Sequence, residues 1–257
     1  MKRNLIIIPI LVMCSIASLY AQDKAQDKTT DNDEHSNKLT ISGNLGFVSD
    51  FIWRGMDQES GASFQPEMTI GWKGLSLSLW GNQSLANRPY KEIDITLDYS
   101  IGGLSLSLTD MWWGGVDAPY GYYRRGPEDN PVDGAHHLEG TVYYSFAETL
   151  NFPLALSWST WVAGADVEGA KGGRAFSSYC TVECPLQCPF DVMFTTSVGL
   201  TPWAGYYHSG FGVTDITFTA EREFNLTQSL SLPVFVRAVV SPISDRVYLV
   251  GGVSLNL

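Results

Sequence analysis

The sequence is short of positive charge. Of its 257 residues, 16 are Lys or Arg and 27 are Asp or Glu, which gives a formal net charge of -11 at pH 7. A nucleic-acid-binding surface needs a basic stripe that can release counterions from phosphates. The scarcity of basic residues therefore argues against nucleic acid as a partner.

Long hydrophobic runs are also missing. The apolar run from Leu5 to Leu19 is too short to cross a bilayer as a helix. It follows Lys2 and Arg3 and ends just before Ala21, which is the pattern of a secretory signal peptide. We therefore expect export, with residues 1–21 cleaved off.

Residues 22–38 lack the apolar side chains that could bury a core. Nearly every residue of this segment is polar, so we expect a disordered polar tether. The alternative is a folded plug, which would need apolar anchors. Because the composition does not change again after Leu39, residues 39–257 are expected to form one domain.

Cysteine is scarce, with four residues in the chain. Cys14 lies within the predicted signal peptide, and lipidation there is disfavoured because the preceding Met13 is bulky. Cys184 and Cys188 flank a segment that contains Pro185, and a hairpin there would bring them within disulfide range. With Cys180, the mature chain keeps three thiols, one ligand short of a structural zinc site. We expect neither a metal nor a cofactor.

The clearest positive signal is strict alternation of apolar and polar residues between 91 and 111. In its first half, five apolar residues occupy every second position, which is the period of a β-strand: Ile93, Ile95, Leu97, Tyr99 and Ile101. The alternation resumes after Gly102 and Gly103, which predicts a hairpin of two strands of about ten residues. Strands of a soluble sandwich are usually nearer six residues, whereas a tilted membrane-spanning strand needs roughly 9 to 11.

The same pattern predicts twelve candidate strands along the chain. Their approximate ranges are 39–54, 62–73, 75–84, 91–101, 103–113, 137–147, 152–163, 175–184, 189–201, 212–224, 229–241 and 246–257. Short connections at 74, 102–103, 148–151, 185–188 and 225–228 alternate with longer ones such as 114–136 and 164–174. This alternation is typical of outer-membrane barrels with short periplasmic turns and longer outward loops. The short connection at 242–245 departs from it.

We therefore predict an all-β fold, a single transmembrane antiparallel up-and-down β-barrel of about 12 strands in the outer membrane of a Gram-negative cell. Its first and last strands should pair, because an open sheet edge is not tolerated in lipid. Aromatic residues at the strand ends predict two interfacial girdles. Tyr99, Phe152, Phe190 and Phe224 would form the periplasmic girdle, and Phe51, Trp112 and Trp203 the outer one.

The first strands also resemble a known family. The sequence SDFIWRG at 49–55, followed by Gln65-Pro66, the stretch from Gly74 to Trp80 and Glu92-Ile93-Asp94, resembles the amino-terminal half of the TorF family of porins. The resemblance covers Leu39 to about Trp113 and implies an outer-membrane barrel. It names no transported substrate.

The polar phase of the strands predicts which charged side chains line the lumen. The pore-lining candidates are Asp50, Arg54, Glu67, Glu92, Asp94, Asp98, Glu139, Asp215, Glu221 and Arg237, and the same phase adds Asp191, Glu223, Lys73 and Arg246, with some of the set at the rims. Acids outnumber bases in this set, so we expect cation preference. Asp50 and Arg54 are four positions apart, and on one extended strand they would form an ion pair facing the lumen.

These patterns favour a porin through which small polar solutes or ions diffuse, with membrane lipid as its other partner. The alternative is a structural or adhesive barrel with a filled lumen. An outer-membrane hydrolase is less favoured, because it would need a histidine beside a serine at the lipid rim. His136, His137 and His208 are instead expected as solvated loop residues, so we do not expect an enzyme.

Overall fold

The computed structural model describes residues 38–86, 90–114, 136–150, 152–169 and 173–257. The predicted signal peptide lies outside the described residues, as do the predicted tether except Lys38 and the interior of the loop 114–136. Within the described ranges, no helix is both long and apolar enough to span a bilayer.

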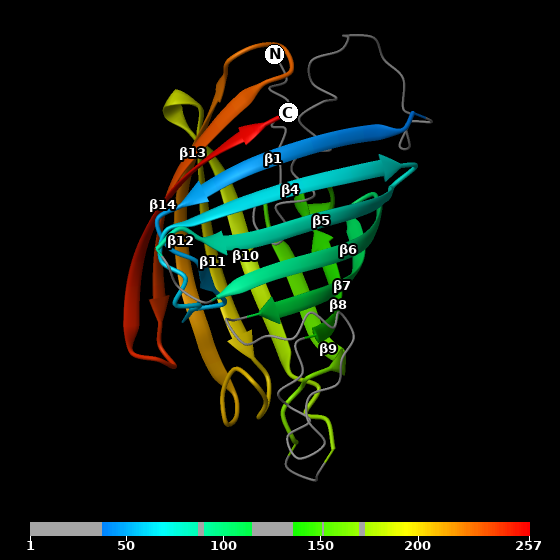
Figure 1. Ribbon diagram of the computed structural model, residues 1–257, viewed down its shortest axis with the longest axis vertical. Helices are drawn as coiled ribbons and strands as arrows, with labels where there is room; N and C mark the ends of the chain where they lie inside the picture. Colours follow the sequence, from blue (N-terminus) through cyan, green and yellow to red (C-terminus); the bar gives the residue numbers. More distant parts are fainter. Residues whose placement is uncertain (1–37, 87–89, 115–135, 151, 170–172) are drawn as a thin grey trace.

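Twelve antiparallel strands form one closed barrel (Figure 1), which confirms the predicted fold. The strands are β1 (Thr40–Val48), β4 (Ser63–Trp72), β5 (Leu75–Ser84), β6 (Lys91–Ile101), β7 (Leu104–Gly114), β8 (His136–Ser145), β9 (Ala155–Gly164), β10 (Ser178–Cys188), β11 (Val192–Thr201), β12 (Gly212–Asn225), β13 (Ser231–Ser241) and β14 (Arg246–Asn256). The short strands β2 (Ile52–Trp53) and β3 (Met56–Asp57) form a separate two-stranded ribbon.

The barrel closes between its first and last strands. β1 pairs antiparallel with β14, with Leu45 opposite Leu255. Beyond the end of β14, Gly43 and Leu257 exchange both backbone hydrogen bonds, at 3.3 and 2.9 Å. The predicted pairing of the two ends of the chain is thus confirmed, and the closure leaves no free sheet edge.

Alternation along each strand separates an apolar exterior from a polar interior. On β6 the side chain of Leu97 is 46% exposed on the outside, whereas its neighbour Thr96 is 7% exposed on the inside. Other apolar residues, which the alternation expected of a membrane barrel puts on its outer face, are also exposed: Ile95, Leu106, Val234 and Leu249. The strand period of two therefore assigns the faces of the barrel as expected.

Inside the barrel, hydroxyl groups from neighbouring strands hydrogen-bond in pairs. Thr69 of β4 contacts Ser78 of β5 at 2.8 Å, and Ser157 of β9 contacts Thr181 of β10 at 2.6 Å. Each pair sits directly opposite in the strand register. Such cross-strand pairs satisfy short polar side chains locally, so this part of the inner wall needs no partner from across the barrel.

One of the predicted short turns lies elsewhere than expected, and another lies where expected but is partly helical. The connection from β8 to β9 contains one helical turn, α2 (Ala147–Leu150). β10 continues to Cys188 and is followed by the 3-10 turn η2 (Pro189–Asp191), so the predicted turn at 185–188 is wrong. Pro185 misleads as a turn signal, because pairing with β11 continues through it. Asp191 consequently lies exposed in the turn and not in the lumen.

The predicted disulfide is also wrong, since Cys180, Cys184 and Cys188 are all free. Cys184 and Cys188 lie four residues apart on the same strand, a separation of roughly 13 Å in extended chain. A disulfide requires Cα atoms closer than about 7 Å. The three thiols share the outward phase of Val182 and Leu186, both exposed.

Candidate functional site

The first connection of the barrel, between β1 and β4, folds its ribbon β2–β3 against the inner wall. Trp53 pairs with Met56, and the turn between them has positive φ at both Arg54 (50°) and Gly55 (78°). This is the backbone of the tight turns that hairpins prefer. A Cβ on Gly55 would come 2.4 Å from the backbone oxygen of Thr214, so only glycine permits this close approach to β12.

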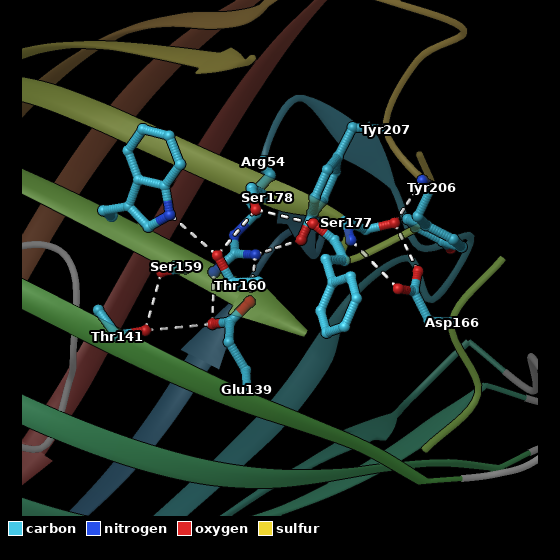
Figure 2. A network of polar contacts seen from close by, with 12 residues as sticks. Arg54, Glu139, Thr141, Ser159, Thr160, Asp166, Ser177, Ser178, Tyr206 and Tyr207 are labelled. Atoms are coloured by element: carbon cyan, nitrogen blue, oxygen red, sulfur yellow. Dashed lines mark hydrogen bonds and ion pairs between the residues drawn. The ribbon is translucent and has the colours of Figure 1, made fainter. Parts of the chain in front are cut away.

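Arg54 at the tip of the ribbon binds Glu139 of β8 on the far side of the barrel in strand order. Its Nη1 and Nη2 atoms donate to the two carboxylate oxygens at 2.6 and 2.7 Å (Figure 2). The two side chains are only 11% and 7% exposed. A bidentate pair that is this buried fixes geometry more strongly than a surface pair.

Aromatic rings complete the surroundings of the Arg54 guanidinium. Its Cζ lies 4.5 Å from the ring centroid of Trp53 and 4.4 Å from that of Tyr179, within cation–π distance of both. Nη1 also donates to the hydroxyl of Tyr207. We call Glu139, Tyr179, Tyr207 and Trp53 the Arg54 cage.

The cage residues are themselves held in place. The hydroxyl of Tyr179 donates to Asp215 at 3.0 Å. Gly199 leaves the necessary room, because a Cβ there would lie 2.3 Å from that hydroxyl. The strand register shifts between Gly199 and Leu200, and again beside Glu139, so each side of the cage adjoins a β-bulge. Bulges redirect side chains and are common at barrel rims and functional sites.

The connection between β11 and β12 supplies Tyr206 and Tyr207 and is fastened by a small polar cluster. Ser177 donates to Asp166 at 2.6 Å, and the backbone N–H of Tyr206 donates to Ser177 at 2.7 Å (Figure 2). Burial raises the pKa of Tyr207 above its ordinary value, so this hydroxyl keeps its proton. Burial opposes the charge on Arg54, but Glu139 and Tyr207 outweigh it, and the pKa of the guanidinium is raised.

Beside the cage lies a group of closely packed rings that we call the aromatic cluster: Trp53, Trp113, His137, Trp161, Tyr206 and Tyr207. Trp161 of β9 is its centre, 0% exposed, with ring centroids of Tyr206 and His137 at 4.7 and 4.5 Å. The cluster joins β7, β8 and β9 to the ribbon and to the β11–β12 connection. Side chains thus occupy the barrel interior near its long-loop end.

Several predicted pore-lining residues lie on the inner face of β6. Glu92 accepts hydrogen bonds from Tyr90 at 2.5 Å and from the indole N–H of Trp113 at 2.7 Å. Asp94 follows two positions on. Asp98, nearer the short turns, accepts from Ser100 and Ser107 at 2.9 and 2.5 Å. One strand therefore carries three inward carboxyl groups, with Thr96 between Asp94 and Asp98.

The remaining predicted residues are spread around the wall. Glu67 is buried on β4, and Asp215 accepts from Tyr179 near the cage. Glu221 lies on β12, while Arg237 of β13 donates to Thr219 at 3.3 Å. Glu223 of β12 accepts from Ser231 at 2.5 Å near the turn end. Lys73 falls in the β4–β5 turn, and Arg246 is exposed at the start of β14.

The prediction that Asp50 and Arg54 share an extended strand is wrong, because β1 ends at Val48 and Arg54 occupies a turn. Asp50 instead accepts the N–H of Phe51 at 2.9 Å, and the carboxylate that binds Arg54 is Glu139. Phe51 was predicted in the outer girdle. Its ring packs on that of Trp80 at 5.5 Å, on the interior phase of β5.

His136 and His137 were predicted to be solvated loop residues, and this prediction is wrong. Both are buried residues of β8. They do point to opposite faces. His136 contacts Asp110 at 2.9 Å on the outward phase, whereas the ring of His137 lies 4.1 Å from that of Trp113 inside. His208 is exposed in the β11–β12 connection.

Sequence reasoning missed Glu183 as an inward acid. It is buried on β10, where the hydroxyl of Tyr143 donates to it at 3.4 Å. It alternates with Val182 inside the expected strand 175–184, so the period of two carried the signal for an inward acid. Tyr179, Trp161 and Tyr207 were also missed, because pairing with Arg54 or with one another depends on how the barrel and its loops fold.

No protein-family model and no curated protein matches this chain. Among solved structures it is similar to a KdgM porin, with 9% identity over 84% of this chain and 97% of that one and a TM-score of 0.46. It is similar to the NanC porin at 8% identity over 84% and 98%, with a TM-score of 0.49. A COG4313 outer membrane channel from Pseudomonas putida F1 shows 13% identity over 89% and 99%, with a TM-score of 0.45. These likenesses concern the barrel fold alone.

Proposed function

We propose that this protein is an outer-membrane barrel through which small polar solutes or ions pass, with a preference for cations. The exposed apolar side chains on the outer face support a lipid environment, since within the described part of the chain no second sheet covers them. The resemblance to the TorF family agrees with this proposal. In this arrangement the short turns and the segment before Thr40 face the periplasm.

The observation that carries the proposal is the excess of acidic over basic side chains on the inner wall. The inward-facing acids are Glu67, Glu92, Asp94, Asp98, Glu139, Glu183, Asp215 and Glu221, against the inward arginines Arg54 and Arg237. A concave wall of one sign concentrates counterions of the other. Since Arg54 is already paired with Glu139, it offsets little of the remaining negative charge.

A barrel with a filled lumen and a structural or adhesive role is the second candidate. The observation in its favour is the aromatic cluster, where Trp161 is fully buried in the barrel interior. Conductance of the purified protein in a planar bilayer discriminates the two. We propose a channel and not an enzyme. His137, whose side chain points inward, supports this choice because it packs on the rings of Trp113 and Trp161.

The test of cation preference is the reversal potential across a salt gradient. We expect a potential of the sign that cation flow gives, weakened when Asp94 and Asp98 are both changed to Asn. Asp191→Asn is the matched control, because Asp191 is an exposed acid in a turn. Anion selectivity would contradict the proposal, and absence of conductance would favour the filled barrel.

A further inference from the structure

Arg54 occupies a site that is built for a guanidinium group. Two parallel N–H···O contacts of 2.6 and 2.7 Å to Glu139 match the planar fork of a guanidinium. The rings of Trp53 and Tyr179 lie 4.5 and 4.4 Å from its Cζ, as suits a flat cation that stacks on aromatic faces. A compact ammonium would use neither feature fully.

Most of the cage does not belong to the ribbon that carries Arg54. Glu139 is on β8 and Tyr179 on β10, while Tyr207 is fastened to the wall through its neighbour Tyr206 and Ser177. Glu139 and Tyr179 each have a wall partner besides Arg54, Thr141 at 3.5 Å and Asp215 at 3.0 Å. The carboxylate and the phenol rings are therefore positioned by the barrel whether or not Arg54 is in place.

The ribbon, by contrast, is held mainly by side-chain contacts with the barrel and has little backbone pairing of its own. Its backbone pairing consists of two residue pairs, Ile52 with Asp57 and Trp53 with Met56, extended by a hydrogen bond from the N–H of Gln58 to the carbonyl oxygen of Phe51 at 3.1 Å. Asp57 of the ribbon and Glu59, which follows the ribbon, are exposed. Its tip contacts the wall through Arg54, the ring of Trp53 and the close fit of Gly55 against β12, while at its base the ring of Phe51 packs on Trp80.

We propose that Arg54 is a built-in occupant of a guanidinium-binding site, and that a solute carrying a guanidinium group displaces it from the cage and releases the ribbon. This inference rests on the proposed function, because it names the class of solute that would use the lumen. The barrel would then bind arginine-like cations at its outer end. The tethered Arg54 competes at an effective concentration of millimolar or more, which weakens binding of a free solute.

The experiment measures binding of free L-arginine by the full chain in detergent, using tryptophan fluorescence and calorimetry. We expect Arg54→Ala to bind L-arginine at least about tenfold more tightly than the unaltered protein, because the competing side chain is gone. L-citrulline, the neutral isostere, should not bind. Adding Glu139→Gln to Arg54→Ala should abolish the gain.

Two further variants make the result decisive. Arg237→Ala removes another inward arginine, which stacks on Phe235 and donates to a hydroxyl, and should not create arginine binding. Arg54→Lys keeps a positive charge but loses the fork, so it should also bind L-arginine more tightly than the unaltered protein. This variant replaces Arg54→Ala in the test if Arg54→Ala does not fold. Heat-modifiable migration in gels establishes folding.

A folded Arg54→Ala variant that does not bind L-arginine would overturn the inference. So would equal binding of L-citrulline, or binding of L-arginine that persists after Glu139→Gln is added. These outcomes do not depend on conduction. If the protein binds L-arginine as expected but passes no current, the proposed channel function fails while the guanidinium site stands.

Discussion

The two ends of the barrel interior are built in different ways. Toward the short turns, polar side chains are satisfied by their neighbours, as in the pairs Ser157–Thr181 and Thr69–Ser78. Toward the long loops, contacts join elements that are distant in strand order, and Arg54 binds Glu139 on another wall. The interior near the short turns is therefore stabilised by contacts between neighbouring strands. The interior near the long loops is stabilised by contacts between distant elements, which are lost together when one of them is broken.

Glu139→Ala should have the largest effect, because it leaves the buried Arg54 guanidinium without its carboxylate. We expect a loss of about 3–5 kcal/mol in the free energy of unfolding. Urea unfolding in lipid vesicles, followed by tryptophan fluorescence, measures it. Thr141→Ala, two residues along the same face, should cost about 1 kcal/mol. Equal losses would mean that the loop end depends no more on long-range contacts than the wall does.

Leu97→Arg tests the boundary that both regions share, the sheet between interior and lipid. An arginine on the outer face near the middle of β6 should cost roughly 2–4 kcal/mol. Thr96→Arg, next to it but facing inward, should cost much less, because a polar and acidic wall can hold the charge. Refolding equilibria in vesicles give both values. If the two variants behave alike, the assignment of the outer face to lipid is wrong.

Gly55→Ala tests whether the ribbon tip must lie against β12. Both Gly55 and Gly102 have positive φ, so alanine at either position adds a backbone cost of about 1–2 kcal/mol. Only at Gly55 would the added Cβ also meet a backbone oxygen, at 2.4 Å, while nothing lies within 4 Å at Gly102. We expect faster trypsin cleavage after Arg54 in Gly55→Ala alone. Unchanged cleavage would show that the ribbon tolerates displacement from β12.

Ser157→Ala should have the smallest effect, since it breaks one hydroxyl pair in the wall. The expected loss is about 0.5–1.5 kcal/mol, the net value of a typical hydrogen bond. Ser229, exposed between β12 and β13, provides a control that should change stability by less than about 0.5 kcal/mol on replacement by alanine. A loss at Ser157 as large as that at Glu139 would remove the distinction between the two ends.

The sequence predicted those features that depend on local alternation. The period of two put Leu97 outside and Thr96 inside, and it placed Glu92, Asp94 and Asp98 on one inner face. The even set of long strands predicted closure, and β1 pairs with β14 accordingly. These predictions succeed because the face of a strand residue is fixed by its parity within a few positions.

Prediction failed where a local signal competes with pairing at a distance. Pro185 indicates a turn when read alone, yet the partner strand β11 keeps it within β10. The alternation around 49–54 suggested one long strand, but the chain leaves the sheet after Val48 and turns at Arg54 and Gly55. The turn predicted at 185–188 would have brought Cys184 and Cys188 together, but both lie on β10 and are kept apart.

By itself, then, the sequence determined the strand count, the two faces of the wall and its acidic interior, since each follows from residues a few positions apart. Only the tertiary structure decided that Arg54 meets Glu139 and not Asp50, and that Trp53, Tyr179 and Tyr207 surround it. These residues come from the first connection, β8, β10 and the β11–β12 connection. Their meeting depends on the curvature of a closed barrel and on the inward fold of a loop, neither of which leaves a periodic trace in the chain.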